Sequence, residues 1–173
     1  IPLAGAIGFG ATTDVQALLR EGPAYAPLIF YTYSQMYGVG EVDPRQYLPE
    51  HFASTLEQDV TTKCIDVFQA YYSYDAAKVY APTFREALFD GTLAHAWPAL
   101  AWRLQQNQAG LSGHGLPALV VQGATDFIVT SATQKKFVDA LRLMESKVTY
   151  ADLPGVSQKE VRQAGFRLSV DWI

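Results

Sequence analysis

Asp126 is the acidic residue whose position in the sequence best suits chemistry. It comes directly after the apolar segment LPALVVQG, which has the length and composition of a buried strand. At the carboxyl end of a parallel strand, a side chain projects into the crevice where α/β proteins do their chemistry. A carboxylate there can orient a histidine and stabilise its imidazolium form. Aspartate is also common in turns, so the spacing leaves a catalytic and a turn-forming Asp126 both open.

Gln158 is the second candidate, in the loop LPGVSQKEV that follows the apolar strand pattern KVTYADL. A general base must accept a proton near neutral pH and return it to a leaving group. A carboxamide forms hydrogen bonds but has no usable basicity in that range. Two interpretations stay open: Gln158 stands where a catalytic base is expected, or it is an ordinary residue at the start of a helix.

The remaining residues that could act as a base or nucleophile are scattered. The three histidines, His51, His95 and His114, all precede Asp126 in the chain. Apolar neighbours flank His95, which is typical of a histidine packed in a core. The segment Gly110–His114 carries part of a nucleophile elbow, but it lacks the final glycine and lies between a helix and a strand, the reverse of the required context. We interpret it as a turn.

Strand and helix patterns divide the chain into three segments. Residues 1–13 contain an apolar run that predicts a central strand covered on both faces. Residues 14–113 show apolar residues at helical spacing and no convincing strand, which predicts a helical insertion. Residues 114–173 alternate strand and helix, with Ser131 as the expected N-cap of the long helix. This alternation predicts an α/β fold with a parallel sheet and right-handed crossovers.

Composition narrows the classes of function. The chain has 173 residues, 49% of them hydrophobic, which suffices for one compact domain with its own core. A net charge of −4 without a basic stripe excludes a nucleic-acid partner. The lone Cys64 forms no intrachain disulfide, and without a metal-binding or phosphate-binding motif we expect no metal and no cofactor. No apolar run approaches the ~20 residues that a membrane-spanning helix needs.

Three stretches together resemble a known family. The pattern LPALVVQGATDFIVTSATQKKFVDALR, then KVTYADLPGVS, looks like the C-terminal part of an α/β-hydrolase, and PLAGAIGFGATTD resembles the strand that follows the nucleophile helix. More narrowly, the chain is similar to the secretory lipases, which include fungal lipases of the Candida antarctica lipase A type. The resemblance implies that Asp126 is the triad aspartate and that Gln158 occupies the histidine position. It also implies a nucleophilic serine upstream of Ile1, because the triad order in this fold is Ser, Asp, His.

The same resemblance carries further expectations. Residues 14–113 correspond to a helical lid, the substrate is a small ester or a lipid, and the protein is secreted. The chain begins inside an apolar run and ends on the apolar segment SVDWI, so we interpret it as part of a longer protein whose N-terminal half carries the serine. Without that serine, and with Gln158 in place of histidine, the chain alone is expected to be inactive.

Alternatives remain at this point. The chain could be a non-catalytic binding protein that keeps a hydrolase fold, and the missing base is the strongest support for this. It could also be an acyltransferase or a peptidase, because one fold supports many chemistries. Nine of the ten tyrosines lie between Tyr25 and Tyr80. They could line an apolar pocket with polar hydroxyls at its rim, or simply pack the helical subdomain.

Overall fold

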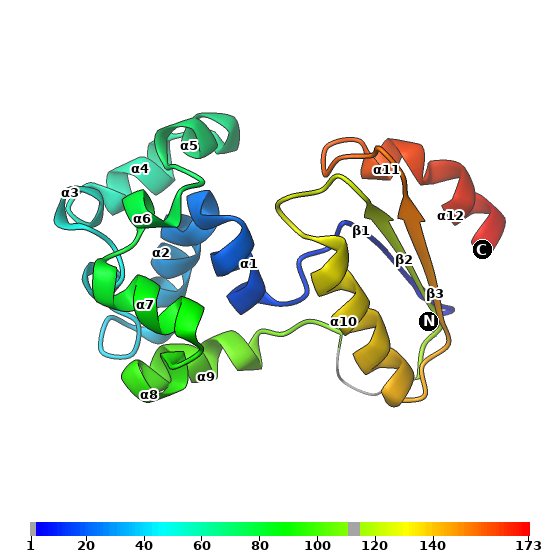
Figure 1. Ribbon diagram of the computed structural model, residues 1–173, viewed down its shortest axis with the longest axis horizontal. Coiled ribbons are helices and arrows are strands. Elements are labelled where there is room, and N and C mark those ends of the chain that lie inside the picture. Colours follow the sequence, from blue (N-terminus) through cyan, green and yellow to red (C-terminus); the bar gives the residue numbers. More distant parts are fainter. Residues whose placement is uncertain (1–2, 111–114) are drawn as a thin grey trace. The chain divides into compact units, whose positions relative to one another are not determined.

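Three parallel strands form the sheet of this protein. The computed structural model describes residues 3–110 and 115–173 (Figure 1). β1 is Ala6–Phe9, β2 is Ala118–Gly123 and β3 is Val148–Leu153. β2 lies in the middle and pairs in parallel with both neighbours. The strands are short apolar runs, as expected for a parallel sheet that is covered on both faces.

Helices cover the two faces of this sheet. α10, residues Ser131–Leu143, connects β2 to β3 and packs against both strands. α11, residues Val161–Ala164, and α12, residues Phe166–Trp172, follow β3 on the opposite face (Figure 1). The core on that second face contains Leu119, Val121 and Val161, all nearly or fully buried. The α/β fold with a parallel sheet that the sequence predicts is therefore confirmed.

Two local expectations for this unit can be set beside the structure. Among the residues that the structure describes, β1 pairs with β2 alone, and the central strand expected for residues 1–13 stays a prediction. The N-cap of α10 is Thr130 rather than Ser131: the Thr130 hydroxyl accepts a hydrogen bond from the Thr133 amide. Ser131 instead donates a hydrogen bond to Asp152 on β3, at 3.0 Å.

The second compact unit is helical and spans Leu18–Gln106, whereas the first combines Ile1–Ala17 with Asn107–Ile173. α1, Val15–Glu21, begins where Asp14 accepts a hydrogen bond from the Ala17 amide. The helices that follow are short: α2 Ala26–Tyr37, α3 Glu50–Ala53, α4 Leu56–Thr62, α5 Ile65–Tyr71, α6 Ala76–Val79, α7 Pro82–Asp90, α8 Leu93–Ala96 and α9 Pro98–Gln106. α8 and α9 are separated at Trp97, because a residue before proline disfavours the helical conformation.

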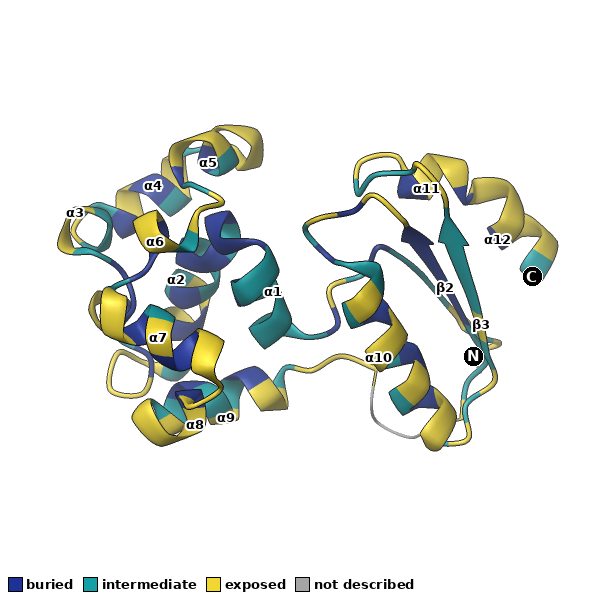
Figure 2. Cartoon of the chain, viewed as in Figure 1, coloured by how far each residue is buried: buried dark blue, intermediate teal, exposed yellow. Residues whose placement is uncertain are grey.

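Aromatic side chains form the main core of the helical unit. Figure 2 shows the buried residues of its helices in dark blue. Phe30 of α2 is fully buried, and its ring centroid lies 4.8 Å from that of Tyr47 and 5.4 Å from that of Phe84. Tyr80 is also buried, and its hydroxyl donates to the Leu19 carbonyl. Burial raises the pKa of Tyr47 to about 12, so this hydroxyl stays protonated in the ordinary pH range. These tyrosines are packing residues of the core.

A buried carboxylate ties α4 to the end of α5. Asp59 accepts hydrogen bonds from the Thr55 and Tyr72 hydroxyls, at 2.8 and 2.9 Å, and pairs with the Lys63 ammonium. Burial raises the pKa of Asp59, but the hydrogen bonds from Lys63, Thr55 and Tyr72 more than offset this and leave the pKa below its ordinary value. Asp59 is therefore a charged group whose hydrogen-bonding capacity is largely satisfied inside the helical unit.

None of the helices in residues 3–110 and 115–173 is long and apolar enough to cross a membrane.

Candidate functional site

Asp126 lies in the turn that follows β2, and the turn holds its carboxylate firmly. The side chain is 5% exposed. One carboxylate oxygen, Oδ1, accepts hydrogen bonds from the backbone amides of Ile128 and Val129, both at 2.9 Å. These bonds orient the other oxygen, Oδ2. The geometry suits a turn-forming aspartate, and it equally suits a carboxylate held in place to orient another group.

Gln122 supports this turn from inside. It is the last residue but one of β2 and is fully buried. Its amide nitrogen donates to the carbonyls of Gly123 and Val129, at 3.0 and 2.8 Å, and lies 3.4 Å from Asp126 Oδ2. The sequence analysis did not single out Gln122. A glutamine inside the apolar run ALVVQG was the signal that could have identified it.

Gln158 lies in the loop that follows β3, and this loop passes close to the end of β2. A Cβ atom on Gly123 would collide with the Val156 carbonyl and lie 3.1 Å from the Ser157 carbonyl oxygen, so glycine allows this close approach. The Gln158 amide nitrogen donates a hydrogen bond to the carbonyl of Gly10, at 3.1 Å. Gln158 is thus half-buried and turned toward the end of β1, not an exposed helix-start residue.

Both candidate side chains approach Gly10. It follows β1, with a φ of +49°, in the left-handed region that glycine tolerates best. A Cβ atom on Gly10 would overlap Gln158 Oε1 and lie 3.3 Å from Asp126 Oδ2. Asp126 and Gln158 therefore approach the same point, at the carboxyl ends of the strands. The sequence analysis did not single out Gly10, although the glycine-rich GFG at the end of an apolar run indicates a close approach there.

The present side chains can form hydrogen bonds at this point but cannot move a proton as a base does. Asp126 offers a carboxylate oxygen, and Gln158 offers an amide whose buried Oε1 accepts no hydrogen bond from the described residues. A carboxamide does not take up a proton near neutral pH. The geometry therefore fits an Asp126 carboxylate that orients the side chain at residue 158, and in this chain that side chain is an amide.

The other sequence candidates lie away from this point or outside the described residues. His51 and His95 belong to the helical unit, and both are exposed. The expectation of a packed core position for His95 is wrong, because the one-turn helix α8 buries Leu93 and leaves His95 in solvent. Ser112 and His114 lie outside the described residues. Within the described part of the chain, no three His, Cys, Asp or Glu side chains form a group that could hold a metal ion.

The sheet, its crossovers and the position of Asp126 define the class of fold: the chain has an α/β-hydrolase-like fold with a helical insertion between β1 and β2. The solved structures to which it is similar are hydrolases and esterases. One is a presumed hydrolase from Legionella pneumophila, with a TM-score of 0.74 and 15% identity. Another is LipA from Xanthomonas oryzae, a rice cell wall degrading esterase, with a TM-score of 0.65 and 14% identity, and its ligand-bound form gives 0.68.

These similarities have definite limits. The alignments cover 95–97% of this chain but only 46–47% of those structures, so the chain spans about half their length. No protein-family model matches the chain, and no curated protein matches it. At such low identity the similarity shows the fold alone. The narrower resemblance to the secretory lipases stays a prediction.

Proposed function

We propose that this chain is part of a serine carboxylic-ester hydrolase of the secretory lipase type. Asp126 is the triad acid, Gln158 occupies the position of the triad histidine, and the nucleophilic serine belongs to polypeptide upstream of Ile1. The chain by itself is catalytically silent, because it provides neither the serine nor a base at residue 158.

One observation carries this proposal: Asp126 Oδ2 and Gln158 Oε1 approach the same point beside Gly10. In the triad mechanism the aspartate holds the imidazole in the right orientation and stabilises its protonated form. The firm hold on Asp126 Oδ1 by two backbone amides suits that role. Residue 158, in the loop after the last strand, suits the role of the residue that is held.

The rest of the mechanism follows from the roles of the missing groups. In a complete triad the serine attacks the ester carbonyl, a histidine at residue 158 takes its proton and returns it to the leaving alcohol, and backbone amides near the serine stabilise the oxyanion. Gln158 cannot carry that proton. The substrate is a small ester or a lipid, the helical unit acts as a lid over it, and the protein is secreted. These points rest on the resemblance of the sequence to the secretory lipases.

The proposal is tested first in this chain alone, with Gln158→His. If residue 158 faces Asp126, the carboxylate favours the protonated imidazole and raises its pKa above the ordinary ~6.5, by about one unit or more. An NMR titration measures this pKa. The double variant Gln158→His, Asp126→Asn is the matched control, and there we expect the rise to disappear. An imidazole at residue 158 with the same pKa in both variants would contradict the proposed pairing.

A second function, that of a non-catalytic binding protein, is favoured by a different contact. The Gln158 amide already donates to the Gly10 carbonyl, so Gln158 has a structural use that needs no catalysis. Ester hydrolysis separates the two functions once the nucleophile-bearing polypeptide is supplied. The hydrolase proposal expects Gln158→His to raise kcat/KM for p-nitrophenyl butyrate by about a hundredfold or more, the usual size of a general-base contribution. A binding protein would gain no activity.

A further inference from the structure

The Gln122 side chain joins the two ends of the turn that carries Asp126. Its single amide nitrogen, Nε2, donates to the Gly123 carbonyl where the turn begins and to the Val129 carbonyl where it ends, at 3.0 and 2.8 Å. A side-chain amide has two hydrogens, so these two bonds use both of them. The amide of Gln122 therefore fixes the two ends of the turn relative to each other.

Val129 connects this bond to the Asp126 carboxylate. Its carbonyl accepts from Gln122, and its amide donates to Asp126 Oδ1 at 2.9 Å, as the Ile128 amide also does. The other oxygen, Oδ2, lies 3.4 Å from Gln122 Nε2, which is longer than an ordinary N–H···O hydrogen bond. Gln122 thus holds the residue that holds Oδ1, and it leaves Oδ2 able to accept a bond from another donor.

The orientation of the Gln122 amide follows from its surroundings. Three oxygens lie near Nε2, and the opposite orientation would place Oε1 against all three, so the nitrogen faces them. Oε1 is then buried without a hydrogen-bond partner among the described residues. An unpaired buried acceptor lowers the stability of a fold. Core packing alone therefore does not explain a glutamine at this position, whereas holding the turn does.

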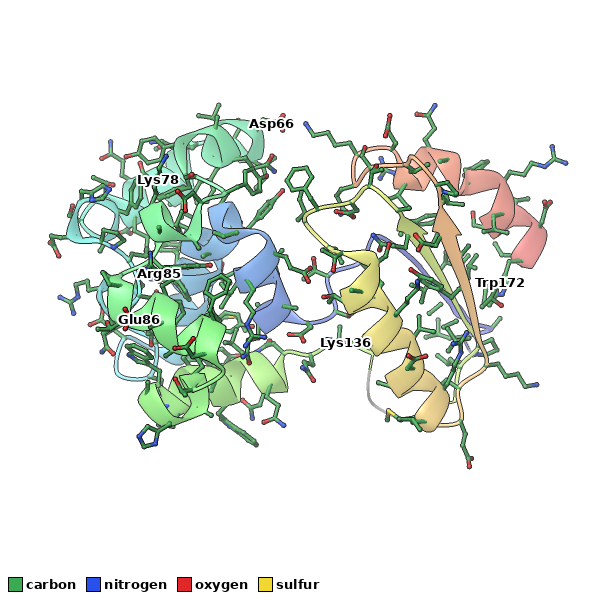
Figure 3. All side chains as sticks on the ribbon, in the orientation of Figure 1. Asp66, Lys78, Arg85, Glu86, Lys136 and Trp172 are labelled. Carbon is green, nitrogen blue, oxygen red and sulfur yellow. The ribbon has the colours of Figure 1, made fainter. Side chains whose placement is uncertain are left out.

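Gln134 of α10 is a buried glutamine of the same kind and serves as a comparison. It is fully buried, its amide donates to the Ala11 carbonyl, and its Oε1 also has no partner among the described residues. It lies on the buried side of α10, whereas Lys136, which Figure 3 labels on the same helix, is exposed. Gln134 reaches the segment after β1, and Gln122 reaches the turn after β2.

We propose that Gln122 is a positioning residue: it joins the two ends of the turn after β2 and so keeps the Asp126 carboxylate in the orientation that directs Oδ2 to the point beside Gly10. The use of Oδ2 there, to orient the side chain at residue 158, rests on the proposed function. Without the Gln122 amide the turn can open, and Oδ1 loses its two donors. The carboxylate then rotates among several rotamers instead of staying in one.

The first test measures the orientation of Asp126 in the 173-residue chain. Three-bond NMR couplings between Asp126 Cγ and the backbone report whether χ1 has one value or averages over several rotamers. We expect one rotamer in the unsubstituted chain and averaged couplings in Gln122→Met, which keeps the approximate size of the side chain but removes both donors. Gln134→Met is the matched control. It also removes a buried amide and its bond to the backbone, and it should leave the Asp126 couplings unchanged.

The second test uses the imidazole at residue 158 in Gln158→His. The rise in its pKa that depends on Asp126 is the difference between this variant and the double variant with Asp126→Asn. Adding Gln122→Met should remove about half of that rise or more, and adding Gln134→Met should leave it unchanged. A purely structural Gln122 would lower the midpoint of urea unfolding without changing this difference.

A second substitution keeps both tests possible if Gln122→Met does not fold. Gln122→Glu has nearly the same shape, and burial keeps the new carboxyl group protonated, so it offers one hydrogen in place of two. We expect it to change the Asp126 couplings and the pKa rise in the same direction as Gln122→Met, by a smaller amount.

The outcomes separate this inference from the proposed function. Averaged Asp126 couplings in Gln122→Met support the inference even if the imidazole at residue 158 shows no rise that depends on Asp126, a result that counts against the hydrolase alone. Unchanged couplings, or a rise that survives Gln122→Met, overturn the inference and keep the function. A larger rise in Gln122→Met also overturns it, because Gln122 would then compete with residue 158 for Oδ2. Equal averaging in Gln134→Met overturns it too, since the loss of any buried amide would have the same effect.

Discussion

The helical unit and the sheet unit differ in how completely they satisfy their own buried groups. In the helical unit, Asp59 has three hydrogen-bonding partners and the buried Tyr80 hydroxyl has the Leu19 carbonyl. Tyr33 is its exception, with a buried hydroxyl that has no partner among the described residues. The sheet unit buries several such oxygens, which include those on Thr13, Gln122, Gln134 and Gln158, and among the described residues its strand β1 pairs on one side only.

This difference matters because buried polar groups are nearly always hydrogen-bonded in native proteins. The helical unit pairs nearly all of its buried polar groups and buries its aromatic core, as an independently folding unit does. In the sheet unit, two of the unpaired oxygens, on Gln122 and Gln158, belong to side chains of the candidate site. The contrast is therefore between a core that pairs nearly all of its buried polar groups and a site that does not.

The largest effect is expected from Phe30→Ala, which opens the aromatic core of the helical unit. Removing a fully buried phenylalanine costs roughly 3–5 kcal/mol of unfolding free energy, a large part of the stability of a small unit. If that unit has its own core, its amides should lose protection against hydrogen exchange while those of β2 and β3 keep theirs. The control is Phe89→Ala, at a 51% exposed position of α7. Equal loss of protection in both units would show that they unfold as one.

An intermediate effect is expected from Gly10→Ala in the sheet unit. A left-handed conformation costs a residue other than glycine about 1–2 kcal/mol, and here the new Cβ atom also overlaps Gln158. Gly155→Ala is the matched control, because Gly155 has a φ of +73° and no heavy atom within 4 Å of an added Cβ. Urea unfolding should show a larger loss for Gly10→Ala than for Gly155→Ala. The excess should vanish in a Gln158→Ala background, and if it persists the overlap with Gln158 is not its cause.

A smaller effect is expected from Tyr72→Phe, which leaves the ring in place but removes the hydroxyl that donates to Asp59. A hydrogen bond to a charged group contributes roughly 1.5–3 kcal/mol, so we expect a loss of unfolding free energy at the lower end of this range. Tyr71→Phe is the matched control, because Tyr71 is adjacent and 46% exposed. Equal losses for the two variants, measured by urea unfolding, would contradict the role given to the Asp59 contacts.

The loss of unfolding free energy caused by Tyr72→Phe should also depend on pH. The pKa of Asp59 is lowered in the folded protein, so its ionised form contributes stability above the unfolded pKa of ~3.9, and this stability is lost as the pH falls through the folded pKa. Tyr72→Phe removes one of the hydrogen bonds that lower this pKa. The cost of Tyr72→Phe should therefore be largest near neutral pH and decrease in acid. A cost that stays constant from pH 7 to pH 3 would show that Asp59 is not involved.

Much of the fold could be predicted from local signals in the sequence. Proline is favoured in the first turn of a helix and glycine just past its end, and α7 has both: it begins at Pro82, ends at Asp90 and is followed by the left-handed Gly91. The apolar runs before Asp126 and Gln158 predicted β2 and β3. Local signals did not decide which of two adjacent hydroxyl residues, Thr130 or Ser131, caps α10. Thr130 rather than Ser131 caps α10, because Ser131 is engaged by Asp152 of β3.

The sequence alone determined the residue types at the candidate site: a carboxylate after one strand, an amide after the next, and no histidine downstream of Asp126. Those facts limit the chemistry, because basicity is a property of the side chain itself. The tertiary structure decided that Asp126 and Gln158 approach the same point beside Gly10, and that Gln122 supports the turn from inside. These contacts join residues up to 148 positions apart in the chain. They depend on strand register and loop path, which the packing of the whole sheet sets and no local pattern encodes.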